Sequence, residues 1–183
     1  MKHLFNLMTC IGFSLVLNAQ SGTLDQSFGD SGKMYYDSTK GDCSSVVVQQ
    51  DGKIITGGQY GEYDLLKYGY IIARFNSDGS IDAGFGHNGQ VLLTSVELGN
   101  IASHFNVLKL QPDGKILGCG YLNASENTDI CVFRLNTNGT LDSSFSDNGV
   151  AIFDIGIGDV PGDMALQNDG KIVVTGKKGC KRK

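Results

Sequence analysis

Apolar and polar residues alternate along three short stretches of the chain, and each stretch leads into the same turn. Large apolar residues stand at every second position before the turn, in the pairs Val46 and Val48, Leu108 and Leu110, and Met164 and Leu166. The residues between them are Val47, Lys109 and Ala165, so a charge is tolerated there. A period of two predicts β-strands that bury the paired residues on one face.

The turn has the sequence Gln-x-Asp-Gly-Lys-Ile and occurs at residues 49–54, 111–116 and 167–172. Asp-Gly between apolar runs predicts a β-hairpin, because glycine adopts a positive φ at the least cost. The structural turn residues are therefore Asp51 and Gly52, Asp113 and Gly114, and Asp169 and Gly170. Two consecutive apolar residues follow each turn, which predicts a strand covered on both faces. A glycine then recurs at positions 58, 120 and 176, where we expect a bend or a close backbone approach.

The hairpin is part of a longer unit, whose copies lie 62 and 56 residues apart. In each unit a box containing an aspartate and a phenylalanine precedes a predicted strand; the boxes are 24–32, 81–89 and 141–149, and the strands 33–37, 90–94 and 150–154. Further strands are predicted at 70–75 and 130–135, which gives units at 22–78, 79–138 and 139–176. Four antiparallel strands in about 60 residues are typical of a β-propeller blade, and a β-solenoid is the alternative. We therefore expect an all-β, β-propeller-type array of four-stranded antiparallel units, incomplete at about two and three-quarter units.

The combined motif runs through residues 24–32, 49–58 and 74–82, and it returns at 111–120, 134–142 and 167–176. It resembles the delta-60 repeat family of bacterial exported proteins. The resemblance implies a propeller-like array and supplies no catalytic residues, because none are assigned in the family. The motif stops at Gly176, and residues 177–183 form a basic tail outside it. A truncated reading frame would explain this stop; the alternative is that several chains assemble into one ring, with self-association through an open sheet edge.

Composition and charge limit the class of protein. The chain has 183 residues with 26 glycines, 2 prolines and no tryptophan, which favours a turn-rich all-β protein. Residues 1–19 have a short basic start and an apolar run, which predict a signal peptide cleaved after Ala19 and a secreted or cell-surface protein with no membrane span after cleavage. Residues 20–176 hold all 19 acidic residues but only 9 basic ones. An acidic body argues against nucleic acid as a partner.

Few residues suggest a chemical site. Cys119 and Cys131 are expected on neighbouring strands and form a possible disulfide, with Cys43 and Cys180 as the other cysteines outside the leader. The histidines form no ligand cluster, so we expect no metal site and no cofactor. The turn at 76–82 has the oxygen-rich composition of a calcium loop, but a turn that caps its own backbone is favoured.

Charged residues recur in the repeat. Arg74 and Arg134 could form an anion site, but pairing with turn aspartates such as Asp82 and Asp142 is favoured. A loop of the first unit is rich in aromatic and acidic residues and is a candidate for a contact surface, although a solvated loop is favoured; it contains Glu62, Tyr63, Asp64 and Tyr68.

The acidic residues recur at turn positions in every unit, as a structural role predicts, whereas an active site would be a singular departure from the repeat. The hypothesis from sequence is therefore an exported, non-enzymatic repeat protein without catalytic residues, a binding or surface scaffold for an unknown protein or glycan ligand. The alternatives are a fragment of an extracellular glycan-active propeller enzyme and a calcium-stabilised adhesin module.

Overall fold

Three antiparallel sheets make up the computed structural model, which describes residues 22–35, 41–61, 68–99, 101–124 and 127–179. Sheet one contains β1 (Ser45–Val48), β2 (Ile54–Tyr60), β3 (Gly69–Phe75) and β4 (Gln90–Thr94). Sheet two contains β5 (Ile101–Leu110), β6 (Ile116–Ala124), β7 (Asn127–Leu135) and β8 (Val150–Phe153). Sheet three contains β9 (Val160–Leu166) and β10 (Ile172–Lys177). A short helix, α1 (Ser95–Leu98), connects the first two sheets.

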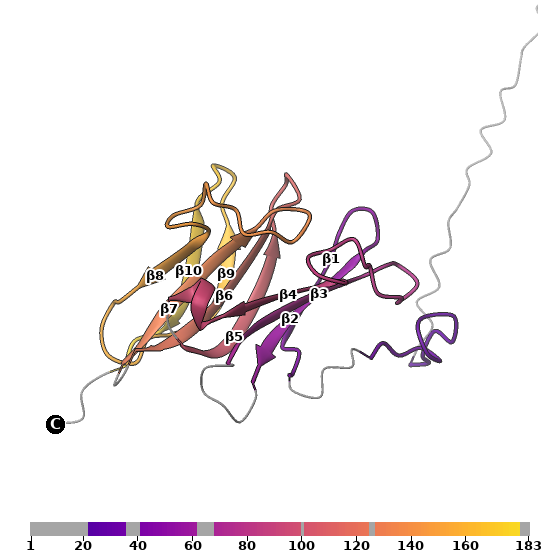
Figure 1. The fold of residues 1–183 in the computed structure, drawn as a ribbon, viewed down its shortest axis with the longest axis horizontal. Coiled ribbons are helices and arrows are strands. Elements are labelled where there is room, and N and C mark those ends of the chain that lie inside the picture. Colours follow the sequence, from indigo (N-terminus) through magenta and orange to yellow (C-terminus); the bar gives the residue numbers. More distant parts are fainter. Residues whose placement is uncertain (1–21, 36–40, 62–67, 100, 125–126, 180–183) are drawn as a thin grey trace, which may run out of the picture.

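The strands of each sheet follow one another in chain order, so every connection within a sheet joins neighbours. The sheets themselves pack face to face in sequence order, as Figure 1 shows from the indigo end to the yellow end. The prediction of an all-β array built from four-stranded antiparallel units is confirmed by sheets one and two.

Two apolar cores separate the three sheets. The core between sheets one and two is centred on three aromatic rings, with 5.4 Å between the centroids of Tyr70 and Phe105 and 5.8 Å between those of Tyr70 and Phe133. The core between sheets two and three is smaller and contains Leu117, Cys119, Ile130, Val132 and Met164. Sheet two therefore buries both of its faces.

This double burial explains the consecutive apolar residues that follow each turn. In β6, Ile116 points into the first core and Leu117 into the second, and both side chains are fully buried. Successive residues of a strand point to opposite faces, so a strand in a middle sheet needs apolar residues in succession.

The recurring glycines after the turns allow close backbone approach, as predicted. A Cβ atom on Gly120 would lie 2.4 Å from the carbonyl oxygen of His104, and one on Gly176 would lie 2.4 Å from that of Val160. Near these points the register of β5 with β6 and of β9 with β10 is irregular.

The sheets are out of phase with the sequence units. The strands that follow the second and third boxes pair with the last strand of the preceding unit, so β4 pairs with β3 and β8 pairs with β7. Sheet one therefore spans residues 45–94 and crosses the boundary expected at 78–79. In the first unit the predicted strand at 33–37 is not formed in its described part, where Lys33 makes only isolated bridges with Gly29 and Asp30.

The predicted buried face is correct in two units and wrong in the first. Leu108 and Met164 are each 1% exposed, whereas Val46 and Val48 are each 63% exposed. The first pair lies on the face of sheet one that points away from sheet two, and no sheet covers it in the described part of the chain.

Several sequence predictions fall on residues outside the described ranges. These are the signal peptide at 1–19, most of the loop around Glu62, Tyr63 and Asp64, and the tail beyond residue 179. Within the described ranges, no helix has the length and apolar character needed to cross a membrane.

Candidate functional site

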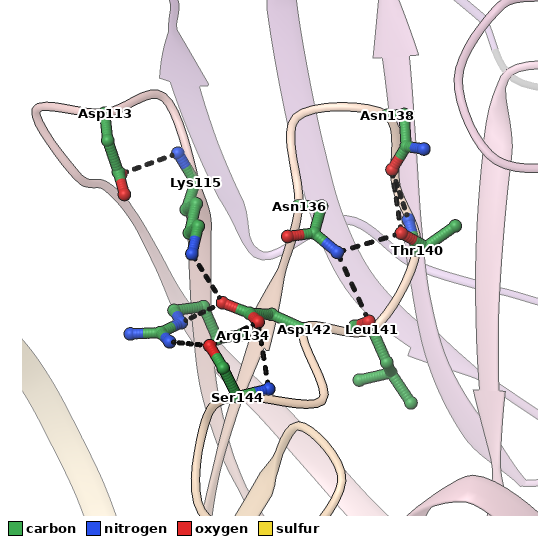
Figure 2. Close-up of polar contacts among 9 residues, drawn as sticks. All are labelled: Asp113, Lys115, Arg134, Asn136, Asn138, Thr140, Leu141, Asp142 and Ser144. Carbon is green, nitrogen blue, oxygen red and sulfur yellow. Dashed lines mark hydrogen bonds and ion pairs between the residues drawn. The ribbon is translucent and has the colours of Figure 1, made fainter.

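The charged residues of the repeat form a compact ion cluster in sheet two, which Figure 2 shows. One carboxylate oxygen of Asp142 accepts hydrogen bonds from Lys115 Nζ at 2.8 Å and Arg134 Nε at 2.7 Å. The other accepts from Ser144 Oγ at 2.7 Å. The guanidinium of Arg134 also lies 4.8 Å from the ring centre of Phe145. The lysine of the turn, the strand arginine and the box residues therefore make one cluster.

The same cluster forms in sheet one. Asp82 accepts from Lys53 Nζ and Arg74 Nε, both at 2.7 Å, and the Arg74 guanidinium lies 4.5 Å from the Phe85 ring centre. Arg74 Nη1 also donates to the carbonyl oxygen of Thr137 at 2.6 Å, which joins sheet one to a turn of sheet two. The favoured interpretation of the two arginines, pairing with box aspartates, is confirmed.

These cations keep both aspartates ionised. The Lys53 ammonium, helped by the backbone of Gly84 and by Arg74, lowers the pKa of Asp82 against the opposing effect of burial. Lys115 and Ser144 hold the pKa of Asp142 far below its usual range. A carboxyl group that must give or take a proton near neutral pH needs a raised pKa, so neither aspartate is suited to general acid catalysis.

The oxygen-rich turns use their side chains on their own backbone. Asp78 Oδ1 accepts from the Ser80 amide at 2.9 Å and from Ser80 Oγ at 2.6 Å, which lowers the Asp78 pKa. Asn138 makes the same contacts with Thr140 in the next unit. Among the residues that the structure describes, no three histidine, cysteine, aspartate or glutamate side chains are arranged to hold a metal ion.

The predicted cysteine pair requires a correction. Cys119 pairs across the sheet with Val132, and Cys131 pairs with Gly120, so the two thiols point to opposite faces of sheet two. Cys119 lies in the core shared with sheet three and Cys131 in the core shared with sheet one, and both are free. The strands are neighbours as predicted, but a disulfide cannot join side chains on opposite faces.

The three Asp-Gly turns gather at one end of the molecule, at the upper edge of Figure 1. They line a single open depression of about 900 Å³. Its lining consists of Val48, Gln49, Gln50, Asp51, Leu110, Gln111, Pro112, Asp113, Gly114, Leu166, Gln167, Asn168 and Gly170. The sequence predicted the turns but not their meeting, because periodicity within a hairpin carries no information on which hairpins become neighbours.

The three turns share one geometry. In the first, the Gln49 amide donates to the Lys53 carbonyl at 2.8 Å, the Gly52 amide donates to the Gln49 carbonyl at 3.0 Å, and Asp51 Oδ1 accepts from the Lys53 amide at 3.1 Å. Gly52, Gly114 and Gly170 have φ values of +83°, +81° and +83°, in the left-handed region that favours glycine. The rim of the depression therefore consists of three turns with equivalent backbone geometry.

Amide side chains give the depression its chemistry. The Oε1 atoms of Gln49 and Gln111 are buried and accept no hydrogen bond within the described part of the chain. The turn lysines Lys53 and Lys115 are directed instead to the ion clusters with Asp82 and Asp142. The lining therefore presents amides, apolar strand ends and aspartates, without lysine or arginine.

The second position of each turn motif is variable and also lies in this lining. It is occupied by Gln50, Pro112 and Asn168, and Gln50 and Asn168 are exposed. Sequence comparison of the three copies identifies this position as the one where the motif differs. A site with a constant frame and variable contact residues is an arrangement suited to ligand binding.

Comparison with known proteins gives matches to two segments, one in sheet one and one in sheet two. Residues 49–85 and 111–145 match the model of a family described as a domain of unknown function (DUF5122) beta-propeller. Each match begins at a hairpin turn and ends at the box phenylalanine, Phe85 or Phe145, so it spans the residues of one ion cluster. No curated protein matches the chain. The chain thus contains two β-propeller-type repeats, similar to a propeller domain family whose function is unknown.

Proposed function

We propose that the protein is an exported, non-enzymatic binding scaffold that holds an extended segment of a protein ligand in the depression between its hairpin turns. The observation that carries this proposal is the convergence of three copies of one turn on a single depression of about 900 Å³. Ligand sites of proteins are concave and contain a few well-placed polar groups.

The repeated carboxylates favour binding over catalysis. Asp82 and Asp142 each form ion pairs with one lysine and one arginine, at equivalent positions of successive sheets. Glycoside hydrolysis needs two carboxyl groups with different proton affinities, one of them raised. The pKa values of these two aspartates are both lowered, which does not support the glycan-active enzyme as a function of the clusters.

The lining favours a polypeptide over a glycan. Each glutamine or asparagine side chain offers one carbonyl acceptor and two amide donors, the same groups that a peptide backbone presents. None of the residues found in the lining is aromatic, and flat aromatic faces are the surfaces on which rings stack. The aspartates Asp51 and Asp113 at the rim add a preference for a segment with basic residues.

Export rests on residues 1–19, whose basic start, apolar run and small residue before the expected cleavage point are typical of a signal peptide. The test is to express the full chain and determine the N-terminal residue of the accumulated protein by mass spectrometry. We expect Gln20 as the first residue, and a cytosolic protein that retains residues 1–19 would contradict export.

The binding test begins with selection of ligands from a displayed peptide library and, in parallel, from a glycan array. The affinity of a selected peptide is then measured by titration calorimetry for the wild type, Gln50→Ala and Asn168→Ala. A hydrogen bond contributes about 0.5–1.5 kcal/mol, so each substitution is expected to weaken binding about 2- to 12-fold. Both residues are exposed, so folding is preserved.

Gln26→Ala is the matched control, because Gln26 is exposed and lies outside the depression. Peptides that bind the two depression variants as tightly as the wild type would contradict the proposed site. Selection of glycans without peptides would contradict the proposed ligand class.

A further inference from the structure

The two interfaces between sheets use equivalent positions. We call the leading face of a sheet the one that, in sheet two, carries Leu108, Leu110 and Ile116 and packs on sheet one. The trailing face is the opposite one, which in sheet two carries Leu117 and Val132 and packs on sheet three. Each interface in the chain therefore joins a trailing face to the leading face of the following sheet.

Sheet one has a leading face that no sheet covers in the described part of the chain. Its strand register pairs Val46 with Thr56 and Val48 with Ile54, as Leu108 pairs with Gly118 and Leu110 with Ile116 in sheet two. The positions are therefore equivalent, but Val46 and Val48 are each 63% exposed whereas Leu108 is 1% exposed. Two large apolar side chains at an interface position are left in water.

A sheet that preceded sheet one would include the box at 24–32, and this box already lies beside sheet one. The Gly29 amide donates to the Asp78 carbonyl at 2.8 Å, as the Gly86 amide donates to the Asn138 carbonyl at 2.8 Å. The box at 24–32 therefore contacts sheet one as the box at 81–89 contacts sheet two. The place that an inner hairpin would take, over Val46 and Val48, is the exposed one.

The trailing face of sheet three is the second face that no sheet covers in the described part of the chain, and it is of the kind that packs on a leading face. Val173 in β10 is equivalent to Leu117 in β6 and Ile55 in β2, which are fully buried, but it is 42% exposed. Strands β9 and β10 correspond to the inner hairpin of a sheet, β1 with β2 or β5 with β6. Sheet three thus presents the kind of element that is missing from the leading face of sheet one.

We propose that a second copy of this chain covers the leading face of sheet one with the trailing face of its own sheet three, so that copies associate head to tail. The contact between copies would be of the same kind as the two interfaces that join the sheets within one chain. Two copies would supply twice three sheets, and six lies within the range of about four to eight blades that close a propeller.

The second copy also contributes to the depression. Its turn at 167–171 would stand next to the turn at 49–53, at the same end of the sheets, and would extend the rim on its open side. The association itself does not depend on the identity of the ligand, because it is argued from the sheet faces alone. Mass measurements test the association and titrations test the ligand, so either proposal can fail separately.

The experiment measures the mass of the protein in solution, purified in the form that the expressing cells accumulate, by sedimentation velocity and light scattering. The variants are Val46→Lys with Val48→Lys, which changes the leading face, and Val173→Lys, which changes the trailing face. Val96→Lys is the matched control, because Val96 is 84% exposed and lies on α1. All three sites are exposed in a single chain, and circular dichroism verifies folding.

We expect the wild type and the control to have twice the mass of one chain, and each face variant to be a monomer. A mixture of the two face variants is expected to form a two-chain species, because one intact leading face and one intact trailing face remain. A monomeric wild type, a face variant that associates like the wild type, or a monomeric mixture would each overturn the proposal. If lysine reduces folding, serine at positions 46 and 48 tests the same face.

Discussion

Gly118→Ala is expected to destabilise the protein through a single contact. Gly118 lies opposite Phe133 in the register of β6 and β7, and a Cβ atom there would be 2.1 Å from Cζ of the ring and 2.5 and 2.7 Å from its two Cε atoms. Ordinary contact begins at 3.4 Å, so the ring would have to move by more than 1 Å. Because Phe133 is fully buried in the first core against the rings of Tyr70 and Phe105, such a movement would displace these neighbours.

Overpacking of this kind costs about 1–3 kcal/mol, and three short contacts place the expected loss near 3 kcal/mol. Sheet one supports the reasoning, since the equivalent cross-strand pair is Thr56 with Ala73. A larger residue on β2 is accompanied there by a smaller one on β3. This pair of positions therefore limits the combined volume of the two side chains, and not the volume of either one alone.

A double-mutant cycle measures the contact directly. Leucine lacks the three ring atoms that the new methyl group would meet, so Gly118→Ala is expected to cost almost nothing in a Phe133→Leu background. The free energy of unfolding is measured by urea denaturation for the wild type, both single variants and the double variant, in the Val46→Lys, Val48→Lys background to exclude effects of association.

Gly162→Ala is the control, because a Cβ atom on Gly162 would meet only the Thr175 carbonyl oxygen, at an ordinary 3.7 Å. It is expected to be neutral or slightly stabilising. If the effects of Gly118→Ala and Phe133→Leu add within about 0.5 kcal/mol, the contact does not limit this position and the reasoning is refuted.

Three further predictions concern charge, thiols and metal. Because the pKa values of Asp82 and Asp142 are lowered, the stability that these aspartates contribute is present above the ordinary aspartate pKa of about 3.9 and is lost as the pH falls toward their folded-state values. The urea concentration at the unfolding midpoint should therefore decrease when the pH is lowered below about 4. An equally large decrease in the Asp142→Asn variant would contradict this. Exposed Cys43 should react with a thiol reagent before Cys119, whose pKa is raised by burial to about 12, and before Cys131; simultaneous labelling in mass spectrometry would contradict the buried placement. Chelator should leave the melting temperature unchanged, and a decrease would instead support the calcium-stabilised module.

Local structure was predictable because it depends on residues close in sequence. The strand expected at 90–94 is β4 with the same bounds, and the arginine–aspartate pairs follow from a spacing that is constant in the repeat. Burial was predictable only where a neighbouring sheet exists. Val46 and Leu108 have the same place in the pattern, yet one is exposed and the other buried, because periodicity identifies a face but not what packs against it.

The cysteine pair shows the same limit at smaller scale. Cys119 and Cys131 lie on paired strands, but their register differs by one residue from the arrangement that would place both thiols on one face. A shift of one residue moves a side chain to the opposite side of a sheet. Sequence alone gives the strands to within a few residues, which is too coarse to decide this question.

The constant and variable positions of the repeat have separate roles in the structure. The motif lysine and arginine hold the box aspartate, and this contact lies at the connection through which sheets one and two each receive their last strand from the following unit. Arg74 then reaches Thr137 and joins that connection to the next sheet. Constant residues therefore maintain the order of sheets and the position of the turns. The variable residues Gln50, Pro112 and Asn168 take no part in these contacts and line the depression, so the proposed ligand site could change its contact residues without altering the ion clusters.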